Sequence, residues 1–310
     1  MAYRPLGRTG VEVSAVSLGT GSLGEMFGPL PEADALSLVD EALDAGINLV
    51  DTSPYYCSAE ERLGKALTPA KRDGVVLATK AGRYGPTDFD FSPARIRRSL
   101  EESLRRLGTD HVDVLQLHDV EFVDLDPVLS DSVAELLRLR EEGKCRFIGI
   151  TGYPLGTFTR VLTEAPVDVV LTYAKGTLLD DSLTTDLLPL AEARGIGVMN
   201  AAAVALGLLS RRGTRFEQEH PAPEPVRRAA AAMVALAEEA GVDLAFLANQ
   251  YAVQRSGAPT TVVGVGRREH LRSALDAVRT PIDQELLDRF LALRPPPDRR
   301  RWRVGLPQNA

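Results

Sequence analysis

The sequence predicts an α/β protein in which residues 1–310 form a single domain, a (β/α)8 TIM barrel. Eight short β-rich runs alternate with longer helical patterns along the chain. The runs are continuously apolar, which is typical of parallel strands covered on both faces. A length of 310 residues also fits one barrel of this class. An open doubly wound sheet is the main alternative, but the turn "GTGSLG" at 19–24 only partly matches its dinucleotide fingerprint.

The N-terminal segment precedes the barrel. Residues 3–16 predict a β-hairpin with its turn in "GRTG", and the first barrel strand ends at Thr20. The first helix is expected over 32–46, where apolar residues recur at helical spacing before Gly46. We expect the other strands at 47–52, 75–80, 112–118, 147–151, 167–173, 196–201 and 260–264, and further helices at 58–67, 92–108, 132–143, 186–195 and 225–241.

Two long connections are polar and rich in proline, one over 211–226 and the other a C-terminal tail from Arg294 onward. Loops of this length in a compact domain are commonly functional or disordered. The tail carries Trp302, the only tryptophan of the chain. We expect the tail to fold over the barrel mouth, with Trp302 beside the substrate.

Composition excludes several classes of protein. The net charge is −7, so the basic footprint of a nucleic-acid binder is missing. No apolar run reaches the length of a membrane span, and the N-terminus lacks the apolar core of a signal peptide. Two cysteines, Cys57 and Cys145, do not make a disulfide framework, and Cys57 is expected to be a small buried thiol. We expect a cytoplasmic protein with no membrane or nucleic-acid partner and no metal site.

Polar residues end three of the predicted strands. "NLVD" ends on Asp51, "VVLATK" on Lys80 and "VLQLH" on His118, and Tyr56 follows the first of these strands. Each residue has an ordinary structural explanation when it is taken alone, such as a helix cap for Asp51. Because the C-terminal strand ends of a barrel meet at one mouth, we expect the four side chains to lie together in a site.

These four residue types suit proton transfer to a carbonyl or alcohol oxygen. A free tyrosine has a pKa of about 10, and a neighbouring ammonium such as that of Lys80 lowers the pKa of the phenol. The Asp51 carboxylate would hold that ammonium charged, and the His118 imidazole would orient the reacting oxygen. Such a site needs a hydride carrier that no side chain supplies, which indicates a nicotinamide cofactor.

The run "DTSPYY", with Lys80 in "ATK" and His118 in "LQLHD", resembles the catalytic tetrad of the aldo-keto reductases. In that family the tyrosine lies five residues after the aspartate, so Tyr56 rather than Tyr55 matches. The resemblance covers nearly the whole chain. The segments "HDVEF", "GKCRFIGITGYPL" and "WRVGLP" look most like the bacterial L-fucose or D-threo-aldose 1-dehydrogenase group.

The resemblance implies an NADP or NAD site along the strand ends. The matching residues are Thr20, Gly21, Asp51, Thr151, Gly152, Tyr173, Ala202, Val204, Gly264, Gly266, Arg267 and His270. Tyr173 stands where a glutamine is usual, and it offers an aromatic face for nicotinamide in place of the residue at Ala201. Arg267 or Arg268 would pair with a 2′-phosphate. The pattern selective for that phosphate is incomplete, so both cofactors remain open.

The predicted activity is hydride transfer between NAD(P) and C1 of an aldose, giving a lactone, or the carbonyl of an aldehyde. Tyr55, His118 and Trp302 are the candidate substrate contacts. Three alternatives are a general aldehyde reductase of the same family, a lyase that forms a Schiff base on Lys80, and a cofactor-sensing regulatory subunit. The substrate is expected to be a small-molecule sugar or aldehyde, and the oligomeric state is not predicted.

Overall fold

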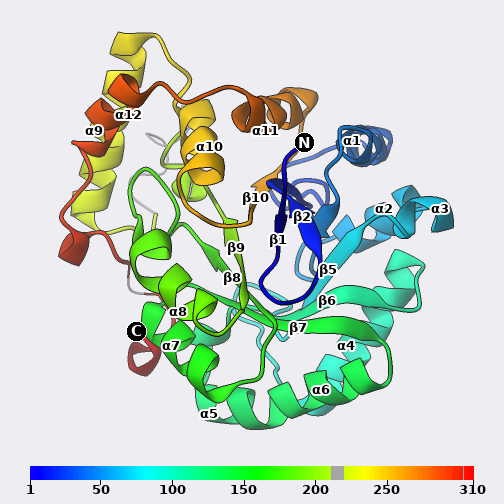
Figure 1. Cartoon of the computed structure of the whole chain (residues 1–310). Helices are drawn as coiled ribbons and strands as arrows, with labels where there is room; N and C mark the ends of the chain where they lie inside the picture. Colours follow the sequence, from blue (N-terminus) through cyan, green and yellow to red (C-terminus); the bar gives the residue numbers. More distant parts are fainter. Residues whose placement is uncertain (211–219, 303) are drawn as a thin grey trace.

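The computed structural model describes residues 1–210, 220–302 and 304–310. Eight parallel strands close into a barrel in the order β10-β3-β4-β5-β6-β7-β8-β9 (Figure 1). This closed order confirms the predicted barrel and excludes the open sheet. The strands are β3 (Val16–Gly19), β4 (Leu49–Asp51), β5 (Val76–Ala81), β6 (Val112–Leu117), β7 (Cys145–Gly152), β8 (Val169–Tyr173), β9 (Gly197–Ala201) and β10 (Thr260–Gly264).

The predicted hairpin is also confirmed. Strand β1 (Tyr3–Pro5) pairs antiparallel with β2 (Glu12–Ser14), and the pair lies across the end of the barrel where the strands begin (Figure 1). The turn approaches the barrel closely, since a Cβ on Gly7 would lie 2.3 Å from the Gly197 amide nitrogen. Leu6 and Val13 therefore pack into the barrel interior with buried residues from six of its strands.

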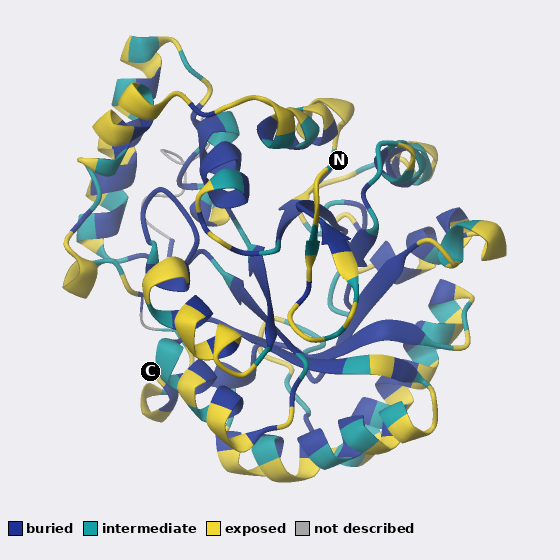
Figure 2. Cartoon of the chain, viewed as in Figure 1, coloured by how far each residue is buried: buried dark blue, intermediate teal, exposed yellow. Residues whose placement is uncertain are grey.

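Helices surround the barrel and bury their apolar faces against it (Figure 2). Strand β4 is followed by two short helices, and the later strands are each followed by at least one. The described helices are α1 (Glu32–Asp44), α2 (Ala59–Ala66), α3 (Pro69–Arg72), α4 (Pro93–Leu107), α5 (Leu125–Pro127), α6 (Val133–Glu141), α7 (Leu155–Glu164), α8 (Leu188–Glu192), α9 (Glu224–Ala240), α10 (Leu244–Gln254), α11 (Arg268–Arg279) and α12 (Gln284–Leu291).

The sequence did not single out the short helices α3 and α5, nor α7, α10, α11 or α12. Helix α10 is buried on nearly all sides, so it lacks the polar face that marks an amphipathic helix. Helix α7 carries three threonines and a glycine, which are weak helix formers. Residues 211–219 of the predicted long connection lie outside the described part of the chain. No helix of the described residues has the length and apolarity that a membrane crossing requires.

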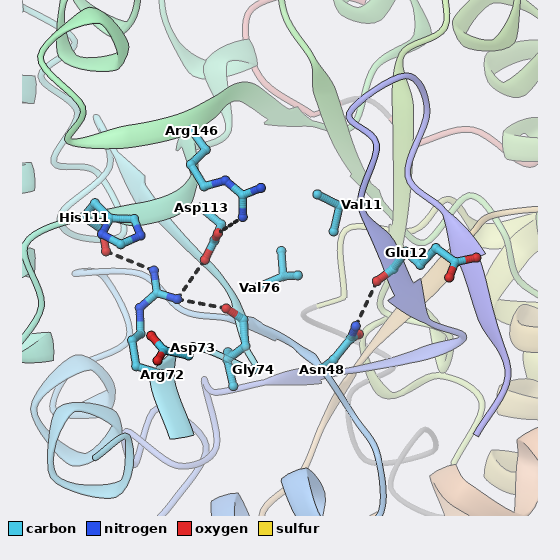
Figure 3. Close-up of a pocket in the computed structure, with 11 residues that line it drawn as sticks. Val11, Glu12, Asn48, Arg72, Asp73, Gly74, Val76, His111, Asp113 and Arg146 are labelled. Carbon is cyan, nitrogen blue, oxygen red and sulfur yellow. Dashed lines mark hydrogen bonds and ion pairs between the residues drawn. The ribbon is translucent and has the colours of Figure 1, made fainter. Parts of the chain in front are cut away.

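The end of the barrel where the strands begin is tied together by one buried carboxylate. Asp113 of β6 accepts a hydrogen bond from the Leu77 amide of β5 at 2.9 Å. It also pairs with Arg72 at 2.9 Å and with Arg146 of β7 at 2.6 Å (Figure 3). These contacts neutralise Asp113 and link the starts of three strands. The hollow drawn in Figure 3 lies at this end of the barrel, opposite the predicted site.

Candidate active site

The four predicted catalytic residues converge at the other end of the barrel. Asp51 is the last residue of β4, Lys80 is near the end of β5, and His118 directly follows β6. Strands β4, β5 and β6 are neighbours in the barrel, so their ends lie side by side. Tyr56 reaches the same place from the loop after β4, which brings the whole quartet together.

Lys80 and Asp51 form a buried ion pair. The Lys80 ammonium donates to Asp51 Oδ2 at 2.5 Å and to the Thr52 carbonyl oxygen at 2.9 Å. Gln116 of β6 donates its amide to Asp51 Oδ1 at 3.1 Å. The Asp51 carboxylate raises the pKa of Lys80 above its usual value despite the opposing effect of burial. Lys80 is therefore held as an ammonium ion.

Tyr56 lies next to this ammonium, with Lys80 Nζ 4.8 Å from the centre of its ring. Burial of the phenol raises its pKa to about 12, although the Lys80 charge acts in the opposite direction. The Lys80 charge does lower the pKa of the Tyr56 phenol, as the sequence predicted. The overall pKa of Tyr56 is nevertheless raised, contrary to that prediction. The desolvation of the phenol outweighs the attraction between phenolate and ammonium. At neutral pH Tyr56 is a proton donor.

His118 packs edge-on against both tyrosines. Its ring centre lies 5.7 Å from that of Tyr56 and 5.9 Å from that of Tyr55. Burial lowers the pKa of His118 to about 3, so the imidazole is neutral at physiological pH. Nδ1 lies 3.1 Å from the Ser53 hydroxyl. A neutral imidazole has one donor nitrogen, which fits a residue that orients a substrate oxygen.

A second group of charges lies beyond His118. Arg83, after β5, forms an ion pair with Asp119, and its guanidinium stacks over the Tyr55 ring at 4.5 Å. Asp119 Oδ1 accepts a hydrogen bond of 2.9 Å from the Thr151 hydroxyl. Arg83 and Asp119 were not predicted, because nothing in the local sequence shows that they meet across two loops.

The backbone of the mouth is unusual. The described non-glycine residues with positive φ all lie in loops that follow barrel strands. Such conformations are sparsely populated and tend to cluster at functional sites. They are Glu25, Cys57, Asp119, Ala174, Ala202, Ala205 and Leu206. Cys57 is exposed with a φ of 50°, so the expectation of a buried thiol is wrong.

Several predicted cofactor residues line these loops. Thr20 is fully buried, and both its amide and its hydroxyl donate to the Asp51 carbonyl oxygen, at 3.0 and 3.1 Å. Thr151 and Gly152 end β7, and Tyr173 ends β8. The predicted positions Gly21, Ala202 and Val204 follow β3 and β9 at the same end of the barrel.

The loop after β10 suits a phosphate group. Gly264 is exposed, and a Cβ on Gly266 would lie 3.1 Å from the Ser22 Cβ, so a side chain at Gly266 would crowd the loop. The loop leads into α11, whose N-cap Arg267 makes no side-chain capping bond. Helix N-termini of this kind attract anions. The residues present therefore fit the phosphates of a dinucleotide.

The two arginines of this loop differ. Arg268 donates to Glu41 Oε1 at 2.7 Å and to the Ser37 hydroxyl at 2.9 Å, so α1 holds it. The Arg267 side chain is exposed and makes no hydrogen bond or ion pair with the described residues. His270, also a predicted contact, is exposed in the first turn of α11.

Trp302 is buried rather than open to the mouth, with 6% of its surface exposed. Its ring stacks on Tyr153 at 5.2 Å, and its main-chain amide donates to the Tyr153 hydroxyl at 3.1 Å. His220 also contacts the indole, edge-on at 5.0 Å between ring centres. Tyr153 lies in turn 5.2 Å from Tyr173, so the tail reaches the end of β8 through one intervening ring.

Gln116 is a site residue that sequence reasoning missed but a simple signal would have found. It precedes His118 by two positions, and alternate residues of a strand share one face. The described residues contain no group of three or more His, Cys, Asp or Glu side chains arranged to hold a metal ion.

Comparisons with known proteins agree with this geometry. The model of the aldo/keto reductase family matches residues 15–294. L-galactose dehydrogenase of Arabidopsis thaliana is 41% identical over 99% of this chain and 98% of its own length. D-arabinose 1-dehydrogenase of Saccharomyces cerevisiae is 35% identical over 85% of this chain and 82% of its own, and D-threo-aldose 1-dehydrogenase of a Pseudomonas species is 31% identical over 84% and 88%.

A solved aldo-keto reductase from Bacillus halodurans, in its holo form, superimposes with a TM-score of 0.75 at 28% identity. The match covers 95% of this chain and 97% of that one. The chain belongs to the aldo/keto reductase family. It is an NAD(P)-dependent oxidoreductase, as the site chemistry predicted.

Proposed function

We propose that the protein is a sugar 1-dehydrogenase that moves a hydride between NAD(P) and C1 of an aldose, yielding a lactone in the oxidative direction. The observation that carries this proposal is the buried Lys80 ammonium, which lies between the Asp51 carboxylate and the Tyr56 ring. The neutral His118 packs against the same phenol. This arrangement can exchange one proton with an oxygen atom at the barrel mouth.

Each residue has a separate role in this mechanism. Tyr56 takes the proton of the anomeric hydroxyl in oxidation and returns it in reduction. Lys80 stabilises the phenolate, and Asp51 keeps Lys80 charged and in place. His118 donates a hydrogen bond to the reacting oxygen. When bound, the nicotinamide supplies the hydride acceptor or donor that the side chains lack.

The substrate class rests on the named relatives and on the character of the mouth. Three relatives are named as dehydrogenases of sugars, namely L-galactose, D-arabinose and D-threo-aldoses. Around the catalytic quartet the chain offers the ring of Tyr55 and the guanidinium of Arg83. Aromatic faces suit the apolar faces of sugars, and charged donors suit their hydroxyl groups.

The geometry disfavours a Schiff-base lyase. A nucleophilic lysine needs a lowered pKa and an accessible amine. Lys80 is 1% exposed, donates two hydrogen bonds and has a raised pKa. A general aldehyde reductase would use the same four catalytic residues, so substrate preference distinguishes it from the proposed sugar 1-dehydrogenase. A regulatory subunit that only senses the cofactor would bind NAD(P) without turnover.

The test is to follow the absorbance of the reduced cofactor across a panel of aldoses and simple aldehydes, with NAD and NADP in parallel. We expect the highest kcat/KM for an aldose in the oxidative direction, with a lactone as product. A preference for simple aldehydes with no aldose oxidation would favour the reductase. Cofactor binding without turnover of any compound would favour the regulatory subunit.

A further inference from the structure

Glu121 is a buried acid that the proposed mechanism does not use. It lies in the short 3-10 helix Val120–Phe122 after β6, and none of its surface is exposed. Its Oε1 accepts a hydrogen bond of 3.0 Å from the Tyr173 hydroxyl at the end of β8. Its Oε2 has no hydrogen-bond partner among the described residues. An unpartnered buried carboxylate oxygen is costly, so this side chain requires an explanation.

The unpartnered oxygen faces the end of β7. A Cβ on Gly152 would lie 2.9 Å from Glu121 Oε2, closer than real Cβ atoms approach. The Glu121 carboxyl therefore occupies the space that a side chain at position 152 would need. Gly152 and Tyr173 end neighbouring strands, and both are among the residues predicted to line the NADP or NAD site. One carboxyl thus touches two adjacent walls of the proposed cofactor pocket.

We propose that the Glu121 carboxyl is a positioning group of the nicotinamide pocket, fixing the Tyr173 ring through Oε1 and excluding a side chain at Gly152 through Oε2. This inference rests on the proposed function, because it assigns Tyr173 and Gly152 to the cofactor. It adds a residue that acts through its neighbours and does not touch the reacting atoms.

The neighbouring groups determine whether the Glu121 carboxyl is neutral or ionised. Burial and the nearby Asp119 charge raise the pKa of Glu121 to about 8. Against them, the hydrogen bond from the Tyr173 hydroxyl favours the anion, as do the main-chain amides of Glu121 and Tyr153, which lie near the carboxyl without forming a well-aligned hydrogen bond to Oε2. The other charges facing this region are Arg83, which is paired with Asp119, and Lys175 after β8, whose pKa is lowered to about 8. Glu121 is therefore the neutral acid at pH 7.

The hydrogen bonds from the described residues of the C-terminal tail to Glu121 reach its main-chain oxygen. The Leu306 amide and the Asn309 side-chain amide donate to the Glu121 carbonyl oxygen at 2.8 and 2.9 Å. These bonds hold the backbone and leave the carboxyl free to change its charge. Ionisation above pH 8 places an anion beside Asp119 with an oxygen that lacks a donor. The walls formed by Tyr173 and Gly152 must then shift.

The experiment is a fluorescence titration with NADH and with NADPH between pH 6 and 9.5 on the wild type and Glu121→Gln. For the wild type we expect a constant Kd up to about pH 7 and a rise above pH 8, approaching about tenfold per pH unit where binding requires the neutral acid. The Glu121→Gln variant keeps an acceptor for Tyr173 and carries no charge, so its Kd should stay flat. The Glu121 charge raises the pKa of Lys175, so the same titration on Lys175→Met separates the two groups. A rise in Kd that persists in Lys175→Met supports Glu121, and a rise that disappears there would overturn the inference.

A second pair of variants tests the space beside Gly152. Gly152→Ala should raise the Kd for NADPH in the wild-type background and do so less in Glu121→Ala, because the methyl group meets Oε2 only in the former. Parallel pH curves for the wild type and Glu121→Gln would overturn the inference while leaving the proposed function intact. Absence of both NADH and NADPH binding in the wild type would remove the inference and the proposed function together.

Discussion

The Lys80 ammonium lies 2.5 Å from the Asp51 carboxylate, and the two side chains are only 1% and 4% exposed. Removing one partner of a buried pair leaves an uncompensated charge in a dry site. Lys80→Met should therefore lower the free energy of unfolding by about 3 to 5 kcal/mol, measured by urea denaturation. The double variant Lys80→Met/Asp51→Asn should recover part of this loss. Additive losses from the two single variants would show that the charges do not stabilise each other.

Tyr56 is expected to be the proton-exchange group. Tyr56→Phe should lower kcat by at least ~10²-fold, the usual scale of general acid–base help. The Kd for NAD(P)H should hardly change, because the ring that packs against His118 remains. Tyr55→Phe is the matched control, since Tyr55 contacts the same imidazole, whereas the Lys80 ammonium lies over the Tyr56 ring. A large loss in Tyr55→Phe with normal turnover in Tyr56→Phe would reverse the assignment.

The two reaction directions should respond differently to pH. Because burial raises the pKa of Tyr56 to about 12, the phenol is protonated throughout the range from pH 7 to 10. Reduction uses this protonated form and should be nearly flat in kcat, whereas oxidation needs the phenolate and should rise with pH, by at most about tenfold per unit. His118 stays neutral and adds no inflection. Profiles at saturating cofactor check this, and an oxidative plateau below pH 8 would show a much lower pKa.

The sequence predicted those parts of the molecule that depend on local pattern. Apolar runs and helical spacing were sufficient to predict the closed barrel and its hairpin. The positions of Asp51, Lys80 and His118 at strand ends were sufficient to predict that these side chains lie together. Gln116 was within reach of the same reasoning, because it shares a strand face with His118.

The remaining features depend on contacts between distant segments. The high pKa of Tyr56 comes from burial by several loops, which no spacing in "DTSPYY" reveals. Glu121 in "HDVEF" was not predicted as a site residue, and it is enclosed by the ends of β7 and β8 and by the tail. Trp302 was expected at the substrate, but it packs between Tyr153 and His220.

The loop after β10 yields a prediction on cofactor choice. Arg268 is paired with Glu41, whereas the Arg267 side chain makes no ion pair with the described residues and can meet a 2′-phosphate. Arg267→Ala should weaken NADP binding by about 1.5 to 3 kcal/mol, the range for a hydrogen bond to a charged group, and leave NAD binding nearly unchanged. Arg268→Ala is the matched control and should affect both cofactors little. Equal losses for NAD and NADP in Arg267→Ala would show that this arginine does not recognise the phosphate.

We expect the C-terminal tail to influence the sugar site indirectly, through the contact of Trp302 with Tyr153, rather than by covering the barrel mouth. Deletion after Pro297 would remove Trp302, but it would also remove the bonds from Leu306 and Asn309 to the Glu121 backbone. A point substitution separates these effects. Trp302→Ala leaves the last residues in place and removes only the ring that supports Tyr153.

We propose that Tyr153, directly after β7, forms part of the wall of the sugar site. With the Trp302 ring lost, Tyr153 can shift and that wall loses its fixed shape. We expect Trp302→Ala to raise KM for aldoses by roughly 2- to 10-fold, the equivalent of one aromatic contact of about 0.5–1.5 kcal/mol. Relative activity should shift toward small aldehydes, which do not need the wall. Trp302→Phe keeps a stacking ring and should behave almost like the wild type. Because the tail still binds the Glu121 carbonyl in both variants, the Kd for NAD(P)H should change little. Identical sugar kinetics in the wild type and Trp302→Ala would mean that Trp302 only anchors the tail and that other loops define the pocket.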